Sequence, residues 1–355
     1  MALSDISQYN SINDYVVGQV LTLTARPEHH NVPQTVMHAR IRQLHTRTLS
    51  YTMVVDILDD HQPPGTNNPT FLKLFDRRFA DQLRDDNGIE PWTKDMEQVY
   101  VQSVQCGTID QFLHDLHHVP DFQEDTEEDW DDAQNETFLA HDILKLYKAE
   151  TAVYRAMQQQ QGHTIPQLLA TVDLDIAPPP NPRNTATPPE DGRSRGGQFE
   201  PFTVKGLLLQ HISGFNLSAL ADHAPRSSWQ AIVDQAVAAV RMLGDYNILN
   251  RDVRPENFMV ASTADQFQVF MIDFALCRFR GEDESDLAWG RAKHTKDEEG
   301  AVGLVMRKVL GRYGFELRYE SELRYVEWAD TDDGFCRGAV GREIRPGVVV
   351  YSRSA

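Results

Sequence analysis

Two short segments in the C-terminal half of the chain hold the residue types that phosphoryl transfer requires. The first is NRDVRPEN at residues 250–257, and the second is MIDFA at residues 271–275. Proteins bind Mg²⁺ through one or two carboxylates and leave places for water and substrate phosphates. Asp273 and Asn257 offer such oxygens, and Asp252 is then free to orient a hydroxyl nucleophile. Because phosphoryl transfer depends mainly on positioning and charge neutralisation, this small set is sufficient for it.

Apolar runs around these segments predict the elements that must position them. Residues 258–260 and 269–272 are apolar and are separated by a polar turn, which predicts a β-hairpin. A helix is predicted before them over 229–243 (WQAIVDQAVAAVRML) and another after them over 300–310 (GAVGLVMRKVL). Residues 311–355 are poorly periodic, and we assign no elements to them.

The sequence NRDVRPEN resembles the catalytic loop of protein kinases, most often H-R-D-L-K-P-E-N, and MIDFA resembles the D-F-G entry. Asp273 follows Asp252 by 21 positions, which leaves room for the hairpin. W-T-x-x-x-E at residues 92–97, together with D-V-R-P-E-N, is also similar to kinase-like proteins of filamentous fungi. The chain is therefore identified as resembling the protein kinase-like superfamily over roughly residues 50–310.

The resemblance implies a role for each polar residue. Lys73, a lone cation in the apolar run TFLKLF, is expected to hold the α- and β-phosphates of ATP. Asp273 and Asn257 are expected to ligate Mg²⁺, and Asp252 to accept or orient the acceptor hydroxyl. Arg254 stands where lysine is commoner and is expected to neutralise the γ-phosphoryl group with its planar guanidinium.

Lys73 should also have a glutamate partner on a helix, and two candidates remain open. Glu150 lies on a helix predicted over 138–160, which we expect Gly162 to cap. Glu97 is nearer to Lys73 in sequence, on a helix predicted over 91–105. If Glu150 is the partner, residues 80–136 are an insertion.

The adenine site is expected in GLLLQHISG at residues 206–214, which resembles the fifth strand and hinge of a kinase. Leu209 would line the back of the pocket, and Gln210 and Ile212 would offer backbone groups to the adenine edge. Further on, residues 298–310 resemble the kinase helix that begins D-x-W-S-x-G, with Glu298 in place of aspartate.

The implied fold class is α+β, a bilobal protein kinase-like fold with ATP in the cleft. Residues 1–212 would form an N-terminal lobe of antiparallel sheet and one packed helix, with insertions at 80–136 and 177–200. Residues 213–355 would form a truncated, mainly helical C-terminal lobe. Strands are predicted in the first lobe at 36–45, 50–58, 71–75, 168–173 and 204–211. The acidic run 121–136 predicts a solvated surface loop, and the Pro- and Gly-rich run 177–200 predicts a long surface insertion.

Several departures from the kinase pattern leave a second function open. No G-x-G-x-x-G is present, and residues 42–50, which would cover the phosphates, contain no glycine. Asn250 replaces the usual histidine, Ala275 replaces the glycine after Asp-Phe, and no A-P-E follows. The short C-terminal region points toward a small-molecule acceptor, whereas NRDVRPEN points toward a protein acceptor. The alternative is a non-catalytic pseudokinase scaffold that binds partners through residues 121–136 or 177–200.

Composition narrows the class of protein. The chain has 355 residues and a formal charge of −19, with no cluster of Lys and Arg that could neutralise a nucleic-acid backbone. Its three cysteines, Cys106, Cys277 and Cys336, form neither a disulfide framework nor a zinc pattern. The N-terminal residues lack a signal-peptide pattern, and no run reaches the ~20 apolar residues of a membrane span. We therefore expect an intracellular protein, cytoplasmic or nuclear, without nucleic-acid or membrane partners.

Overall fold

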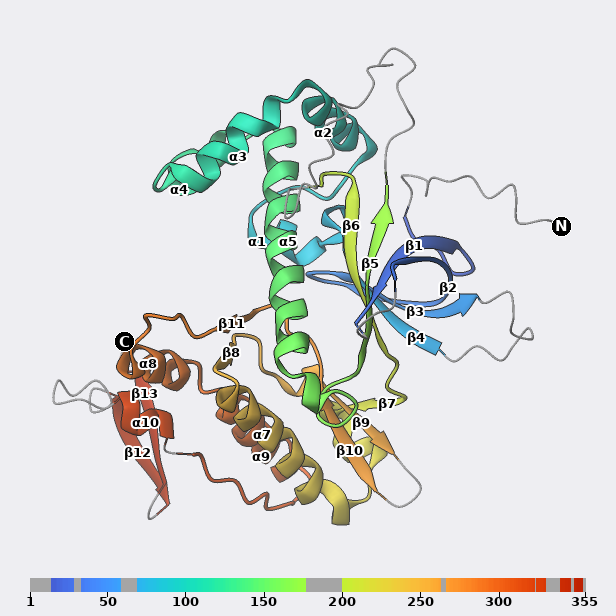
Figure 1. Ribbon diagram of the computed structural model, residues 1–355. Coiled ribbons are helices and arrows are strands. Elements are labelled where there is room, and N and C mark those ends of the chain that lie inside the picture. The colour runs from blue at the N-terminus through green and yellow to red at the C-terminus, as the bar shows by residue number, and fades with distance from the viewer. Residues whose placement is uncertain are drawn as a thin grey trace. The chain divides into compact units, whose positions relative to one another are not determined.

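The chain forms two units that both combine helices with antiparallel strands, as Figure 1 shows. The computed structural model describes residues 14–28, 33–58, 69–176, 200–262, 266–322, 324–329, 339–345 and 348–353. Unit 1 comprises residues 1–151 and 168–211, and unit 2 comprises residues 152–167 and 212–355. Most of the predicted Pro-rich insertion, residues 177–199, lies outside the described residues.

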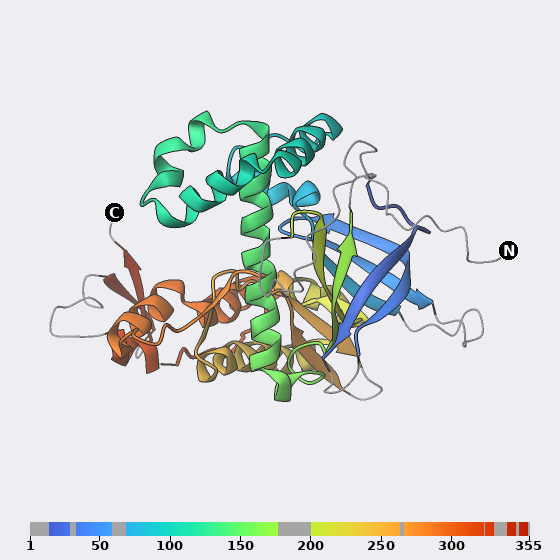
Figure 2. The same ribbon diagram turned by 45° about the horizontal axis from the view of Figure 1, so that its top comes forward.

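Six strands of unit 1 close into an antiparallel barrel in the order β1-β2-β3-β4-β6-β5, and Figure 2 shows them curving around one another. They are β1 (Val20–Pro27), β2 (Thr35–Arg47), β3 (Tyr51–Leu58), β4 (Pro69–Phe75), β5 (Leu168–Asp175) and β6 (Thr203–Gln210). Pairing of β1 with β5, for example Thr24 opposite Asp173, closes the ring. Closure leaves none of these strands as an exposed sheet edge.

The five strands predicted in this region are all present, and β1 is an additional strand. Its sequence VLTLTARP alternates, and Leu21, Leu23 and Ala25 are fully buried in the barrel core. On β4, Leu72 and Leu74 point into the same core. Burying such side chains contributes about 1.5–3 kcal/mol each, so the alternation fixes which face of each strand points inward.

Gly206 on β6 permits the close approach of this strand to β4, where it lies opposite Leu74. A Cβ at this position would lie 2.8 Å from the Lys73 carbonyl oxygen and 2.8 Å from Leu74 Cδ2. We expect Gly206→Ala to lower the free energy of unfolding by about 1–3 kcal/mol, because the added methyl group overpacks the barrel. Urea denaturation measures this change. Gly311→Ala is the control, since a Cβ there meets nothing within 4 Å; equal stability of the two variants would contradict the prediction.

Five helices complete the described part of unit 1. They are α1 (Asp81–Asp86), α2 (Lys94–Cys106), α3 (Thr108–His118), α4 (Phe122–Thr126) and α5 (Asp132–Ala156), the last of which continues into unit 2. The helix predicted over 91–105 begins at Lys94, because the Thr93 hydroxyl accepts a hydrogen bond from Met96 N at 3.2 Å. The helix predicted over 138–160 ends at Ala156, so Gly162 is not its cap; Gly162 lies in a later turn with a φ of 78°.

The prediction of a loop at residues 121–136 is wrong, whereas the prediction that the segment is solvated is confirmed for eight of its nine acids, which are exposed. This segment contains α4 and the start of α5. Trp130 packs on the ring of Phe112 at 5.0 Å between centroids and on that of Phe138 at 5.3 Å. Glu136 is fully buried, where it accepts a hydrogen bond from Arg84 at 2.6 Å and forms an ion pair with Arg77. The aromatic packing and these two guanidinium groups offset the charge repulsion that the acidic composition suggests.

Unit 2 contains shorter strands and the remaining helices. Its strands form three antiparallel sheets, β10-β9-β7, β11-β8 and β12-β13. The strands are β7 (Gly214–Asn216), β8 (Ile248–Asn250), β9 (Phe258–Ser262), β10 (Phe267–Met271), β11 (Cys277–Phe279), β12 (Ala339–Arg345) and β13 (Val348–Arg353). The helices are α6 (Leu220–His223), α7 (Trp229–Asp245), α8 (Asp286–Lys296), α9 (Glu298–Gly311) and α10 (Arg324–Ala329).

The predicted hairpin is β9–β10, with Val260 opposite Val269, and the two predicted helices are α7 and α9. Three elements, α10, β12 and β13, fall in the region after residue 310 to which the sequence assigned none. Across the described ranges, no helix has both the length and the apolar character that crossing a membrane requires.

Candidate functional site

Lys73 and Glu150 form a buried ion pair within unit 1. Lys73 lies on β4 between Leu72 and Leu74, whose side chains fill the barrel, so strand alternation directs Lys73 to the opposite face. Its Nζ donates a hydrogen bond to Glu150 Oε2 on α5 at 2.7 Å. The two side chains are 5% and 1% exposed. A charged pair this deeply buried holds both groups in one geometry, since neither can leave its partner without a large desolvation cost.

Glu97, the other candidate partner of Lys73, is bound elsewhere. Both of its carboxylate oxygens accept hydrogen bonds from Arg77 Nη2, at 2.8 and 2.7 Å. Trp92 Nε1 also donates to it at 2.9 Å. Glu150 is therefore the partner of Lys73. Glu97 belongs to the buried network that attaches α2 to the rest of unit 1.

In unit 2, residues 250–257 form a loop whose polar groups bind one another. Asn257 Nδ2 donates hydrogen bonds to the Asp252 carbonyl oxygen at 2.8 Å and to Asp252 Oδ2 at 3.0 Å. Arg254 Nη2 lies 3.3 Å from the same carboxylate oxygen, and its side chain is 49% exposed. Asn250, which stands where kinases usually have histidine, accepts a hydrogen bond from Asp252 N through Oδ1 at 2.9 Å. The loop thus fixes the Asp252 carboxylate from two sides.

Asp273 is positioned beside this loop by the end of the β9–β10 hairpin. Ile272 N donates a hydrogen bond to the Asn257 carbonyl oxygen at 2.9 Å. This bond holds the backbone next to Asp273 against the loop. Asp273 has a φ of 65°, a left-handed conformation that aspartate adopts more readily than most residues. Phe274 is fully buried, and its ring lies 5.4 Å from that of Tyr154. The buried ring anchors the turn that carries Asp273.

Asn257 and Asp273 offer oxygen atoms of the kind that Mg²⁺ prefers in proteins. The amide nitrogen of Asn257 is bound to Asp252, which leaves its Oδ1 as an oxygen donor. Among the described residues, no group of three or more His, Cys, Asp and Glu side chains could hold a metal alone. Mg²⁺ commonly needs only one or two protein oxygens when waters and substrate phosphates complete its shell. The donor set is therefore suited to Mg²⁺ carried by a nucleotide.

A buried ion pair between Lys293 and Glu298, which the sequence analysis did not predict, supports the backbone at the start of the 250–257 loop. Asn250 N donates to Glu298 Oε1 at 2.7 Å, and Glu298 is paired with Lys293. Lys293 in turn donates to the Ile248 carbonyl oxygen at 3.0 Å. Burial raises the pKa of Glu298, while the adjacent Lys293 acts in the opposite direction and favours the carboxylate. Lys293 carries no sequence signal, because it resembles any other basic residue in the last turn of α8.

The residues predicted to contact adenine lie at the end of β6 and directly after it. Leu209 is 4% exposed and lies opposite Phe71 on β4, and Gln210 is the last residue of β6. Ile212 is half-buried and is the first residue of this segment assigned to unit 2.

The turn expected to cover the phosphates joins β2 to β3, and its polar groups are bonded to other groups of the protein. Thr48 N donates to the Ser50 carbonyl oxygen at 3.3 Å, and Gln82 N donates to the Thr48 carbonyl oxygen at 3.2 Å. Arg47 pairs with Asp81 at 3.0 Å. The Thr48 N–H is therefore already used within the turn, whereas a phosphate-binding turn offers such groups to its ligand.

The predicted polar residues thus form two clusters, Lys73 with Glu150 in unit 1, and Asp252, Arg254, Asn257 and Asp273 in unit 2. Neither a protein-family model nor a curated protein matches the sequence. Among solved structures, the chain is similar to a double mutant of the PknI kinase domain of Mycobacterium tuberculosis, at 11% identity and a TM-score of 0.33. The match covers 89% of this chain and 98% of that chain.

Proposed function

We propose that the chain is an ATP-dependent phosphotransferase of the protein kinase-like superfamily. It would transfer the γ-phosphoryl group of Mg-ATP to a hydroxyl group of a protein Ser or Thr or of a small molecule. The observation that carries this proposal is the Lys73–Glu150 ion pair. It joins residues 77 positions apart at 2.7 Å, in an environment where an unpaired ammonium would be strongly disfavoured. The kinase resemblance requires such a pair.

Each polar residue has a part in the proposed reaction. Lys73, held by Glu150, would bind the α- and β-phosphates. Asp252 would accept the proton of the acceptor hydroxyl as its oxygen forms a bond to the γ-phosphorus, while the bond between that phosphorus and the β,γ-bridging oxygen breaks and ADP leaves. Asp273 and Asn257 would hold Mg²⁺, which would neutralise phosphate charge. Arg254, 3.3 Å from Asp252 and half-exposed, would neutralise charge on the transferred group.

A second candidate function is a pseudokinase scaffold that binds partners without transferring phosphate. The observation that favours it is the β2–β3 turn, where no glycine is present and the Thr48 N–H is bonded within the turn. This turn argues against nucleotide binding, whereas Lys73 of the first cluster would contact the phosphates of a bound nucleotide. Nucleotide binding therefore separates the two functions.

Thermal unfolding with ATP tests the proposal against the scaffold. We expect ATP with Mg²⁺ to raise the unfolding temperature by several degrees, because a ligand at 100 times its Kd stabilises the folded state by about 2.7 kcal/mol. ATP with EDTA should raise it less. ADP with Mg²⁺ controls for general nucleotide effects. Absence of any rise with ATP, with or without the metal, would contradict phosphotransfer and support the scaffold.

A further inference from the structure

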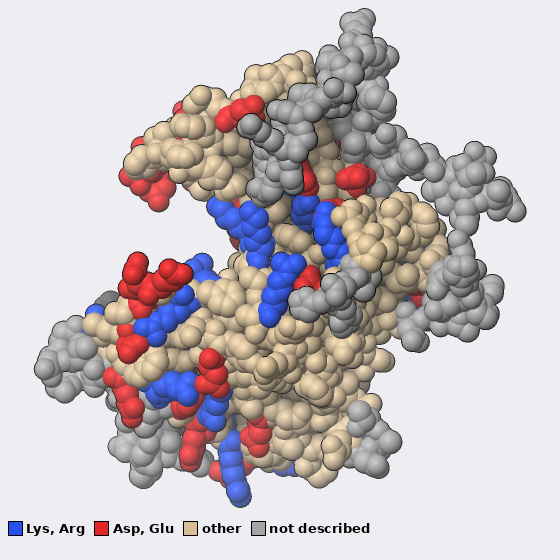
Figure 3. Space-filling view, viewed as in Figure 1, with Lys and Arg blue, Asp and Glu red and all other residues tan. Residues whose placement is uncertain are grey.

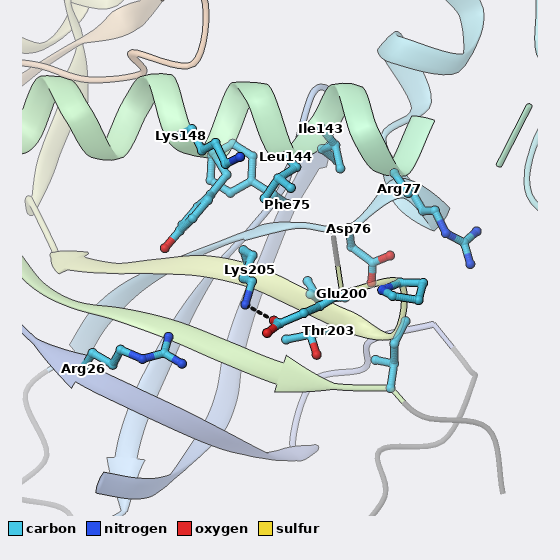
Figure 4. Close-up of a pocket in the computed structure, with 15 residues that line it drawn as sticks. Arg26, Phe75, Asp76, Arg77, Ile143, Leu144, Lys148, Glu200, Thr203 and Lys205 are labelled. Carbon is cyan, nitrogen blue, oxygen red and sulfur yellow. Dashed lines mark hydrogen bonds and ion pairs between the residues drawn. The ribbon is translucent and has the colours of Figure 1, made fainter. Parts of the chain in front are cut away.

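A cavity in unit 1 is separate from the residues assigned to phosphoryl transfer. It lies between α5, the end of β4 and the start of β6 and has a volume of about 240 Å³ (Figure 4). Apolar side chains make much of its wall; they include Phe75, Ile143, Leu144, Ile176 and Val204. Such a volume is just below the range of roughly 300–1,000 Å³ for drug-sized ligands, so it suits a compact organic molecule.

Cationic side chains surround this apolar wall. Arg26, Arg77, Lys148 and Lys205 line the cavity, against only two acids, Asp76 and Glu200. The chain as a whole has the opposite balance, with a formal charge of −19. Figure 3 shows lysine and arginine side chains gathered over the region of α5 and β6. The cavity is therefore a locally basic site on an acidic protein.

Three of the four cations are already neutralised. Arg26 pairs with Asp173 at 2.6 Å, and Lys205 pairs with the same carboxylate at 3.2 Å and also with Glu200 (Figure 4). The third neutralised cation, Arg77, is bound by Glu97 and Glu136. The lining acid Asp76 is likewise occupied, since Arg78 and Tyr15 both donate to it at 2.7 Å.

Lys148 differs from these three cations. It is exposed on α5, and no acid of the described part of the chain lies within ion-pair distance of it. Lys145, one turn earlier on the same helix, pairs with Asp142 at 3.1 Å. Lys148 therefore keeps its positive charge available at the rim of an apolar cavity.

We propose that this cavity binds a small organic carboxylate, with an aromatic or branched apolar body against Phe75 and Leu144 and its carboxylate at Lys148. One available cation matches one negative charge, which favours a monoanion over a phosphate dianion. The apolar wall supplies affinity, and the charge contact supplies selectivity over neutral analogues. Lys73, Glu150, Asp252 and Asp273 do not line the cavity, so the proposal stands independently of the phosphotransferase function.

The test uses two probes of the same shape, 2-naphthoate and neutral 2-naphthamide, whose binding to the full chain is measured by ligand-observed NMR titration. We expect naphthoate to bind about three- to tenfold more tightly than naphthamide. Lys148→Gln should remove that difference. Lys145→Gln is the matched control, an exposed lysine on the same helix that does not line the cavity, and it should preserve the difference.

A second variant tests whether the probes occupy this cavity. Leu144→Trp replaces a leucine side chain in the cavity wall with a bulkier indole ring. We expect both probes to lose binding while the circular dichroism spectrum of the protein is retained. The proposal is overturned if neither probe binds saturably to the natural chain, or if both bind equally well. It is also overturned if the two lysine variants behave alike, or if a folded Leu144→Trp variant binds both probes unchanged.

Discussion

Replacing Asp252 with asparagine is expected to lower the rate of ATP turnover by about 10²–10⁴-fold, the range for removing a general acid–base group. Asparagine has the same shape but cannot accept the proton of the acceptor hydroxyl. Because the contacts that Asn257 makes to the backbone of residue 252 remain, we expect folding and the Kd for Mg-ATP to change little. The measurement is formation of ADP from ATP, with water or an added alcohol as acceptor, alongside nucleotide titration.

Glu256→Gln is the matched control for this variant. Glu256 lies in the same loop, is exposed, and loses its charge by the same chemical change. It should turn over ATP at nearly the natural rate. Equal activity of Asp252→Asn and the natural chain would show that the loop does not have the proposed role, and an equal loss in both variants would show that loop charge alone matters.

Replacing Glu150 with alanine is expected to lower the free energy of unfolding by about 3–5 kcal/mol, because it leaves the Lys73 ammonium buried without its carboxylate. The two side chains are 5% and 1% exposed, so water cannot replace the lost partner without a rearrangement. Under the proposed function, ATP should also bind more weakly, because Lys73 is no longer fixed. Urea denaturation measures the first effect, and nucleotide titration measures the second.

The same helix offers a control for the Glu150 variant. Asp142→Ala removes the acid of another lysine pair, Lys145–Asp142, in which the lysine side chain is 60% exposed. An ion pair of this kind contributes about 0–1 kcal/mol. If the free energy of unfolding of Glu150→Ala is no lower than that of Asp142→Ala, the prediction for the buried pair is wrong.

The sequence predicts those parts of the site that depend on local order. The hairpin β9–β10 has apolar runs on both sides of a polar turn, and Lys73 is the one cation in the apolar run TFLKLF. The two candidate partners of Lys73 could not be separated, because both Glu97 and Glu150 lie on helices with suitable patterns. The choice between them depends on Arg77, which donates hydrogen bonds to both carboxylate oxygens of Glu97. No local pattern reports such a contact.

The errors in the sequence analysis have identifiable physical causes. The acidic composition of residues 121–136 correctly indicates an exposed segment but wrongly predicts a loop, although Trp130 within the run is a signal that part of it packs against apolar residues. Closure of the barrel was not predictable, since it depends on pairing of β1 with β5, which lie about 150 positions apart in sequence. The alternation within β1, by contrast, is a local pattern that is typical of a strand.

Calorimetric titration of ATP tests the central claim most directly, with the natural chain, Lys73→Met and Asp273→Asn each measured with Mg²⁺ and with EDTA. We expect Mg²⁺ to strengthen binding of ATP to the natural chain. Lys73→Met should weaken binding under both conditions, since under the proposed function the lysine would contact the phosphates directly. Asp273→Asn should remove only the strengthening by Mg²⁺. Absence of ATP binding to the natural chain, or an unchanged effect of Mg²⁺ in Asp273→Asn, would contradict the account.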